Sequence, residues 1–362
     1  MIYRLCILLS FFLHQHTCSN HSTSYQSPKQ ANNIILLIGD GMGLGHITAG
    51  LYSSDKPLHL ERFKHLGLAK THSANQLITD SAAAATAIAC GQKTRNEAIG
   101  VDAQEKPLTS ILKLAQQQHK KTGLISSTSI VHATPAAFVA NMNWRKKYDA
   151  IALQYLDVPT NILIGGGKHY FNERKDGLNL LDSLQKRGYQ LFKELADAQV
   201  TNAIQSYKWA VLLGKRRPKA TINGRGDFLP DATQLALQHL NNRKGFFLMV
   251  EGAQIDYAGH QNFSTWLIAE MLDFDKTVGR ALDFAEADGN TLVIVTADHE
   301  TGGYAINDNI LSHKKFDTKF TTDYHTGTMV PVFAYGPGAE KFNGIYENTE
   351  LFYKMKQAYG FE

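Results

Sequence analysis

Cysteine is scarce in this sequence, with 3 among 362 residues, whereas histidine occurs 15 times. Cys6 lies inside an apolar N-terminal run, which leaves Cys18 and Cys90. Two cysteines are too few for a framework of disulfides. A metal site in this chain therefore has to be built from histidine and carboxylate side chains rather than from thiolates.

An excess of charge of one sign is also missing. The 37 Lys and Arg residues nearly balance the 33 Asp and Glu residues, for a formal net charge of +4. Proteins that bind nucleic acid through a basic surface carry a more one-sided charge, so no nucleic-acid partner is expected. With 43% hydrophobic and 19% charged residues, the composition indicates a globular chain rather than a disordered one.

No apolar run is long enough to span a membrane, which takes about 20 residues. The run Leu5–Leu13 is shorter and follows Arg4, a pattern typical of a secretory signal peptide. We expect a signal peptide at 1–18, a disordered polar segment at 19–31, and export to the periplasm or the extracellular space. A lipid anchor at Cys18 is a weak alternative, because Gln15-His16-Thr17 lacks the small residues that lipoprotein processing prefers.

From residue 32 onward, short apolar runs alternate with longer helical patterns. We predict helices at 108–119, 232–240 and 265–286, and strands at 34–38, 122–126, 161–164, 245–250, 291–296 and 331–335. This alternation predicts an α/β fold, a three-layer sandwich whose large, mostly parallel central sheet has helices on both faces. Residues 32–362 are expected to form a single domain, with less regular excursions from the sheet at 165–228 and 303–328.

Three predicted strands end directly in acidic residues and histidines. The residues at these ends are Asp40, Glu251, Asp256, His260, Asp298 and His299. In an open α/β sheet, ligands bind outside the carboxyl ends of the strands, so these side chains are expected at one edge. Taken singly, Asp40 could serve a turn, Asp298 a helix cap and His260 the core. Together they favour a metal site, because carboxylate and imidazole are metal ligands.

Ser81 precedes an Ala-rich segment with helical character that extends to Cys90. One interpretation makes Ser81 the N-cap of that helix. The other makes it a nucleophile. The N-terminus of a helix attracts an alkoxide or a phosphate, and coordination to Zn²⁺ can deprotonate a serine hydroxyl.

Taken together, six motifs resemble those of the alkaline phosphatase family, in the same order and at compatible spacing. They are Asp40-Gly-Met-Gly, Thr79-Asp80-Ser81-Ala-Ala-Ala-Ala-Thr86-Ala, His132-Ala-Thr134-Pro-Ala, Glu251-Gly-Ala-Gln-Ile-Asp256 with His260, Asp298-His299-Glu-Thr-Gly-Gly, and His325. The short chain and the residues at 132 and 257 are most similar to the compact bacterial branch from marine or cold environments. The resemblance covers about residue 32 to the C-terminus and implies a single catalytic domain that forms a homodimer.

The resemblance implies a hydrolase of small phosphate monoesters that holds two zinc ions and one magnesium ion. The implied ligands are Asp256, His260 and His325 for the first zinc, Asp40, Asp298, His299 and Ser81 for the second, and Asp40, Thr134 and Glu251 for the third ion, with His132 beside it. The enterobacterial members have Asp at the position of His132. Because imidazole is a softer ligand, the third site is expected to accept zinc as well as magnesium.

The resemblance further implies that Ser81 forms a phosphoserine, that Arg145 clamps two phosphate oxygens, and that Asp80 orients Arg145. Tyr257 stands where the enterobacterial members have Lys, which predicts weaker retention of the product phosphate. Lys215-Arg216-Arg217 is interpreted as a solvated surface loop.

Two other classes of protein are alternatives to an alkaline phosphatase. The first is a related two-metal hydrolase, namely a phosphodiesterase, a sulfatase or a cofactor-independent phosphomutase. Sulfatases need a Pro-x-Arg pattern that Ser81-Ala-Ala-Ala lacks, and phosphodiesterases usually have a Thr nucleophile and no Arg clamp. The second is a non-catalytic exported protein that binds zinc or phosphate, which gives no reason for Ser81 to lie beside both metals.

Overall fold

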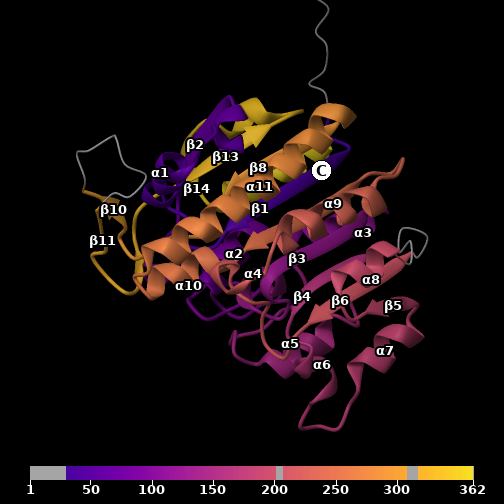
Figure 1. The fold of residues 1–362 in the computed structure, drawn as a ribbon. Helices are drawn as coiled ribbons and strands as arrows, with labels where there is room; N and C mark the ends of the chain where they lie inside the picture. Colours follow the sequence, from indigo (N-terminus) through magenta and orange to yellow (C-terminus); the bar gives the residue numbers. More distant parts are fainter. Residues whose placement is uncertain (1–29, 201–206, 308–316, 362) are drawn as a thin grey trace, which may run out of the picture.

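The computed structural model describes residues 30–200, 207–307 and 317–361 (Figure 1). Within these ranges a ten-stranded sheet runs in the order β14-β2-β13-β8-β1-β7-β3-β4-β6-β5. The strands are β1 (Asn33–Gly39), β2 (His65–Lys70), β3 (Lys121–Ser129), β4 (Ile162–Gly166), β5 (Tyr189–Phe192), β6 (Lys208–Leu213), β7 (Phe246–Gly252), β8 (Thr291–Thr296), β13 (Val330–Tyr335) and β14 (Gly344–Glu347).

The sheet is mostly parallel, as predicted. Of its strands, β13 runs antiparallel to both neighbours, β2 and β8, while the other pairings are parallel. Every residue of β1, β7 and β8 is buried, because helices cover both faces of the sheet at its centre. This explains why these strands are continuous apolar runs in the sequence and confirms the predicted three-layer fold.

Two groups of helices form the outer layers. On one side α9 packs along α11, in front of the sheet in Figure 1. On the other side α2 contacts α3, α4 and α12. The helices are α1 (Leu44–Ser53), α2 (Ser81–Cys90), α3 (Ile111–Gln117), α4 (Ala133–Ala136), α5 (Tyr148–Gln154), α6 (His169–Asn172), α7 (Leu180–Lys186), α8 (Leu195–Val200), α9 (Phe228–Leu240), α10 (Gln254–His260), α11 (Ser264–Asp288) and α12 (Glu350–Tyr359), with 3₁₀ turns η1 (His59–Arg62), η3 (Thr221–Asn223) and η4 (Ala339–Phe342).

The prediction that 165–228 leaves the sheet is wrong. Strands β5 and β6 lie in this stretch and continue the sheet beyond β4 as its edge. Strand β5 is only four residues long and half-exposed, so it lacks the apolar run that marks a central strand. The described residues of the stretch 303–328, namely 303–307 and 317–328, lie outside the main sheet. They contain β10 (Ala305–Ile306), β11 (Thr318–Lys319) and β12 (His325–Thr326), and β12 pairs with β9 (Glu300–Thr301).

The predicted signal peptide at 1–18 and nearly all of the segment at 19–31 fall outside the described residues. Ala31 belongs to the fold, because its side chain is buried and its N–H donates to the carbonyl of Ala358. In the described part of the chain, no helix combines the length and the apolar character that crossing a membrane requires.

Candidate active site

The carboxyl ends of three central strands meet at one edge of the sheet. Strand β1 lies between β7 and β8, and Ile38 is in register with Glu251 of β7 and Thr296 of β8. Asp40 directly follows β1, and Asp298 is the second residue after β8. The structure therefore brings Asp40, Glu251 and Asp298 to the same edge, as their places at strand ends suggest.

A first group of ligand-type atoms comes from α10 and β12. Asp256 Oδ1 lies 3.3 Å from His260 Nε2 and 3.6 Å from His325 Nε2, and the two Nε2 atoms are 3.2 Å apart. The other ring nitrogens are held by main-chain carbonyls, His260 Nδ1 by Asp323 and His325 Nδ1 by Thr79. These contacts orient both Nε2 atoms toward Asp256, as in histidines that bind metal.

A second group surrounds His299, just beyond β8. Its Nε2 lies 3.1 Å from Asp298 Oδ2 and 3.5 Å from Asp40 Oδ1, while its Nδ1 lies 3.2 Å from Thr301 Oγ1. The hydroxyl of Ser81 is 3.3 Å from the same Nε2. His299, Asp256 and His325 also bring ligand atoms within 4.8 Å of one another. The first and second groups are therefore adjacent.

A third group contains Asp40, Glu251 and His132, whose ligand atoms lie within 4.8 Å of one another. Ser126 donates its hydroxyl hydrogen to Glu251 Oε2 and holds that carboxylate in place. Thr134, in α4, has a buried hydroxyl with no hydrogen-bond partner in the described part of the chain. Asp40 thus belongs to both the second and the third group. His132 belongs to the third group, to which it contributes a ring nitrogen.

The crowding of these carboxylates shifts their ionisation. Burial and the charges of Asp298, Asp256 and Glu251 raise the pKa of Asp40 well above its usual value. Burial likewise raises the pKa of Glu251 to about 7. The pKa of Asp298 is lowered, because the attraction of His299 outweighs the effect of burial. A cluster of this kind is costly to bury unless a cation compensates it.

Two of the histidines are neutral at physiological pH. Burial and the nearby charge of Arg145 lower the pKa of His132 to about 3. Burial and His299 lower the pKa of His325 to about 4. Neutral imidazole is the form that binds metal ions.

Several polar atoms of the cluster are buried without a hydrogen-bond partner among the described residues. They are Asp40 Oδ1, Glu251 Oε1, Asp298 Oδ2, Thr134 Oγ1 and His132 Nδ1. Buried polar atoms without partners are rare in proteins, and a cation would satisfy the oxygens. The donor set of carboxylate oxygens, imidazole and hydroxyl fits divalent cations of the zinc and magnesium type. We therefore regard this edge of the sheet as a candidate metal centre.

Ser81 is the first residue of α2, and Asp80 is the N-cap. One carboxylate oxygen of Asp80 accepts the N–H of Ala83 over 3.0 Å. The side chains of α2 are buried throughout, and Gly91 ends the helix with φ = 73°, a conformation that glycine adopts without strain. Asp80 therefore takes the capping role considered for Ser81, and the Ser81 hydroxyl is left to face His299.

Arg145 lies beside this serine. Its Nη1 donates to Asp80 Oδ2 over 2.9 Å, and its Nη2 lies 3.3 Å from His132 Nε2. Although burial opposes the charge, Asp80 raises the pKa of Arg145 and keeps it a cation. Arg145 and Ser81 line a cavity of about 250 Å³ together with Asp256, His260 and His325. Serine, guanidinium and the first group of ligands thus share one space.

Tyr257, in α10, also lines this cavity. Its hydroxyl lies 3.0 Å from Thr128 Oγ1, and the guanidinium carbon of Arg217 stands 4.4 Å from the centre of its ring. Burial raises the pKa of Tyr257 to about 12, so the phenol is neutral. A cation is therefore present next to Tyr257, supplied by the segment 215–217 that the sequence presents as a plain surface loop.

Sequence reasoning missed three supporting residues of the site. Thr301 donates to Asp256 Oδ1 over 2.6 Å, Ser126 binds Glu251, and the carbonyl of Thr79 holds His325. Thr301 and Thr79 stand inside the motifs themselves, so their positions were available in the sequence. Ser126 carries no such signal, because nothing in the sequence distinguishes it from the three hydroxyl residues that follow it in β3.

The comparisons with known proteins agree with this geometry. The model of the family described as "Alkaline phosphatase" matches residues 31–319 and 307–361. The chain belongs to the alkaline phosphatase family. Alkaline phosphatase 4 of Bacillus subtilis (strain 168) is 37% identical over 420 residues, which covers 91% of this chain and 89% of that protein.

Solved structures of alkaline phosphatases share the fold. The alkaline phosphatase from the Antarctic bacterium TAB5 is 39% identical, with a TM-score of 0.88 over 93% of this chain and 100% of that one. A variant of the TAB5 enzyme with Mg bound gives the same TM-score at 38% identity. The resemblance to this family is confirmed, and the chain is a hydrolase of phosphate monoesters, which sets aside a non-catalytic binding protein.

Proposed function

We propose that this enzyme hydrolyses phosphate monoesters through a phosphoserine at Ser81, with two zinc ions and one magnesium ion as cofactors. The observation that carries the proposal is the position of the Ser81 hydroxyl. It stands at the N-terminus of α2 and 3.3 Å from His299 Nε2, in the cavity that Arg145 and His325 line. A phosphate in this cavity meets a nucleophile, a guanidinium and the metal ligands at once.

The ligand sets follow the three groups of side chains. Asp256, His260 and His325 would hold one zinc, and Asp40, Asp298 and His299, with Ser81, the other. The third ion would be held by Asp40, Glu251 and Thr134 with His132 close by. The variant of the TAB5 enzyme with Mg bound supports magnesium in this family. Because His132 offers a softer ligand than a carboxylate, the third site would also take zinc.

The proposed reaction has two steps, and both take place at phosphorus. Bound metal ions would lower the pKa of the serine hydroxyl and of a water, and would neutralise charge on the phosphate oxygens. In the first step, Ser81 Oγ bonds to phosphorus as the bond to the ester oxygen breaks and the alcohol leaves. In the second step, a water oxygen attacks phosphorus, the bond to Ser81 Oγ breaks, and inorganic phosphate forms.

Arg145 binds and orients the phosphate in both steps. Its guanidinium matches two oxygens of a phosphate in a fork that lysine cannot form. Asp80 fixes the orientation of that fork through its 2.9 Å hydrogen bond to Nη1. Phosphoryl transfer depends more on such positioning and charge compensation than on a general base.

We also infer export from the signal pattern at 1–18, to the periplasm or the extracellular space, with a lipid anchor at Cys18 as the weaker alternative. The homodimer rests on resemblance to the family. Light scattering of the purified chain would measure its mass in solution, and the mass of one chain would contradict a dimer.

Steady-state hydrolysis tests the proposed function. A phosphate monoester, a phosphate diester and a sulfate ester are compared with Zn²⁺ and Mg²⁺ added, and the variant Ser81→Ala serves as control. We expect the monoester to be the preferred substrate and the variant to lose nearly all activity. A variant that keeps most of its activity would exclude the phosphoserine, and activity that resists chelators would exclude the metal assignment.

A further inference from the structure

A second cavity adjoins the one that contains Ser81. It measures about 550 Å³, and Arg216 and Arg217, which help to line it, are exposed to solvent. His132, Tyr148 and Tyr257 line both cavities. A molecule whose phosphate lies against Ser81 can therefore extend past these three side chains into the second cavity, which we call the arginine cavity.

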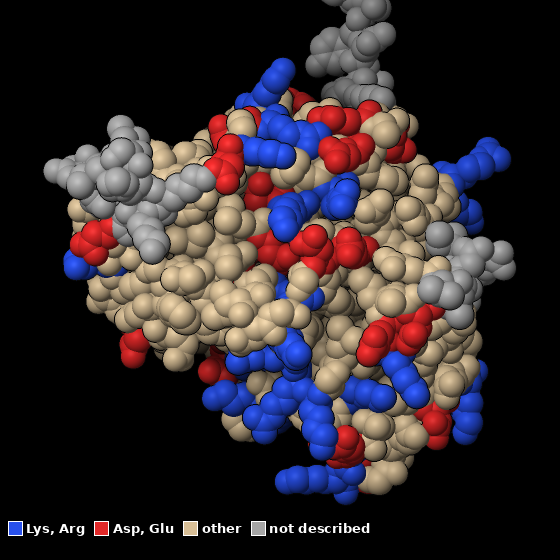
Figure 2. Space-filling view, in the orientation of Figure 1, with Lys and Arg blue, Asp and Glu red and all other residues tan. Residues whose placement is uncertain are grey.

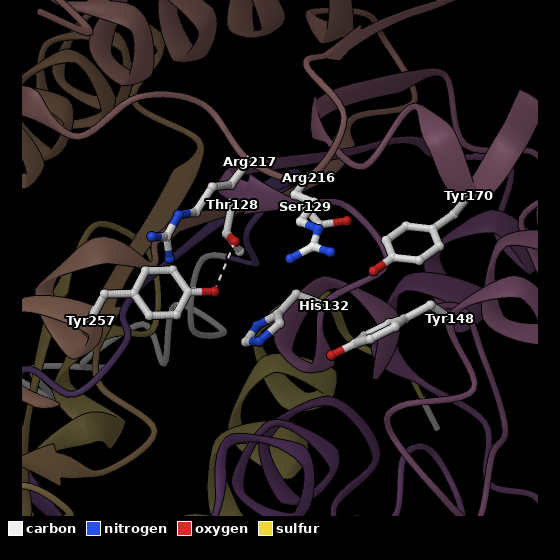
Figure 3. Close-up of a pocket in the computed structure, with 8 residues that line it drawn as sticks. All are labelled: Thr128, Ser129, His132, Tyr148, Tyr170, Arg216, Arg217 and Tyr257. Atoms are coloured by element: carbon white, nitrogen blue, oxygen red, sulfur yellow. Dashed lines mark hydrogen bonds between the residues drawn. The ribbon is translucent and has the colours of Figure 1, made fainter. Parts of the chain in front are cut away.

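Two guanidinium groups dominate the arginine cavity. In Figure 3 the Arg216 side chain points toward the space between His132 and Tyr170, while Arg217 stands over the ring of Tyr257. Neither arginine forms an ion pair with any described residue, and the neighbouring Glu173 pairs with Lys215 instead. Figure 2 shows Lys and Arg side chains gathered over α5 and α6, near this cavity, whereas they alternate with Asp and Glu elsewhere on the visible face.

The main chain that carries these arginines is fixed relative to the catalytic residues. A Cβ at Gly166 would lie 2.6 Å from the carbonyl oxygen of Arg216, so the loop packs tightly on the end of β4. The buried Gln254 donates through Nε2 to the carbonyls of Pro218 and Lys219. Because Gln254 opens α10, two residues before Asp256, the loop and the catalytic helix are held together.

The remaining wall is aromatic. The rings of Tyr148 and Tyr170 lie with their centres 4.9 Å apart, and Figure 3 shows both hydroxyls directed toward the cavity. Tyrosine offers an apolar face to a sugar or other ring and a hydroxyl that can bond to it. Arginines that form no ion pair with a described residue, placed beyond such a wall, form a site for an oxyanion such as phosphate.

We propose that the arginine cavity is an accessory subsite that binds a second phosphate group, carried by the leaving group of the substrate. The enzyme would then favour phosphate monoesters whose alcohol bears another phosphate over otherwise identical alcohols without one. This inference rests on the proposed function of Ser81 for its catalytic consequence. The binding preference itself depends only on the geometry of the two cavities.

Binding without turnover tests the subsite directly. The metal-loaded variant Ser81→Ala is titrated by calorimetry with glucose 1,6-bisphosphate and with glucose 6-phosphate. We expect the bisphosphate to bind about tenfold more tightly, beyond the statistical advantage of two phosphates, since each charge-assisted hydrogen bond contributes this order of affinity. Adding Arg216→Gln and Arg217→Gln should bring the two dissociation constants close together. Raising the salt concentration should narrow the gap, because both arginines are exposed.

A matched control removes one positive charge elsewhere. Lys186 ends α7, just before β5, and so lies toward the amino ends of the parallel strands, away from the cavities. Lys186→Gln should leave the preference for the bisphosphate intact. If Lys186→Gln lost the preference for the bisphosphate to the same extent as the arginine variants, net charge alone would explain the preference. That result would overturn the accessory subsite.

Turnover by the enzyme with Ser81 intact separates the two proposals. The ratio of kcat/KM for the bisphosphate to that for the monophosphate should fall about tenfold in the double arginine variant. An unchanged ratio, with turnover intact, would overturn the accessory subsite and leave the proposed function standing. Absence of turnover on any phosphate monoester, with the binding preference still lost in the arginine variants, would overturn the proposed function and leave the subsite standing.

Discussion

Asp80 joins Arg145 to the start of the helix that carries Ser81. Asp80 Oδ2 accepts a hydrogen bond of 2.9 Å from Nη1 of Arg145, and Asp80 Oδ1 accepts one of 3.0 Å from the main-chain N–H of Ala83. One carboxylate thus sets the position of the guanidinium relative to the serine hydroxyl. We therefore expect the rate of hydrolysis to depend on the shape of the Arg145 and Asp80 side chains as well as on their charge.

Replacing Arg145 with Lys keeps the charge but removes the planar fork. We expect kcat/KM for a phosphate monoester to fall about 10- to 100-fold, the equivalent of one to two charge-assisted hydrogen bonds. Steady-state kinetics would measure the fall. Asp80→Asn is the companion variant, because Asn caps a helix as well as Asp does and should lower activity with little change in thermal stability. Equal activity of Arg145→Lys and the unaltered enzyme would show that the fork is not used.

Removal of the metal ions should destabilise the protein as well as inactivate it. Asp40 and Glu251 would be left as buried carboxylates whose oxygens Oδ1 and Oε1 have no hydrogen-bond partner among the described residues. We expect a chelator to lower Tm by about 5–10 °C and added Zn²⁺ and Mg²⁺ to restore it, as measured by calorimetry. In Asp40→Asn the gap between metal-loaded and metal-free protein should shrink, because a shared ligand is lost. A Tm that no chelator changes would contradict the metal centre.

Replacing Tyr257 with Lys should strengthen inhibition by inorganic phosphate. The side chain lines the cavity of Ser81, and an ammonium group there would add attraction for the product. We expect the phosphate inhibition constant to fall about tenfold. Tyr257→Phe is the matched control, since it keeps the ring beneath Arg217 but adds no charge. No tightening in Tyr257→Lys would contradict the role given to this position.

Arg225 should be important for stability rather than for catalysis. Its side chain is buried and donates to Glu270 and Asp273 of α11. Arg225→Ala leaves two buried carboxylates without their partner, and we expect it to lower the free energy of unfolding by about 3–5 kcal/mol. Lys276→Ala, which breaks the exposed pair with Asp227, should cost less than about 1 kcal/mol. Denaturant unfolding would compare them, and similar losses would contradict the distinction.

The fold was predictable where strands are buried on both faces. The runs around Ile34–Ile38 and Thr291–Thr296 have no polar interruption, and they became β1 and β8 at the centre of the sheet. The edge strands β5 and β14, and β2 beside β14, were not predicted, because each exposes part of its surface and has no continuous apolar run. Strand β6 was not predicted either, although four of its six residues are buried.

The site was predictable where its residues follow strands or belong to motifs. Asp40, Asp298 and His299 stand at strand ends, and the sheet brings them together. Arg217 could not be predicted in the same way, since its approach to Tyr257 depends on Gly166 and Gln254, which are distant in sequence. Long-range packing of this kind leaves no local pattern.

The most direct test of the mechanism is detection of phosphate on Ser81. The enzyme is mixed with excess phosphate monoester, quenched with acid before steady state, and digested for peptide mass spectrometry. We predict one added phosphoryl group, located on Ser81 and absent from Ser81→Ala. An enzyme that turns over the substrate while Ser81 stays unmodified, or that carries the label on another residue, would contradict the phosphoserine mechanism.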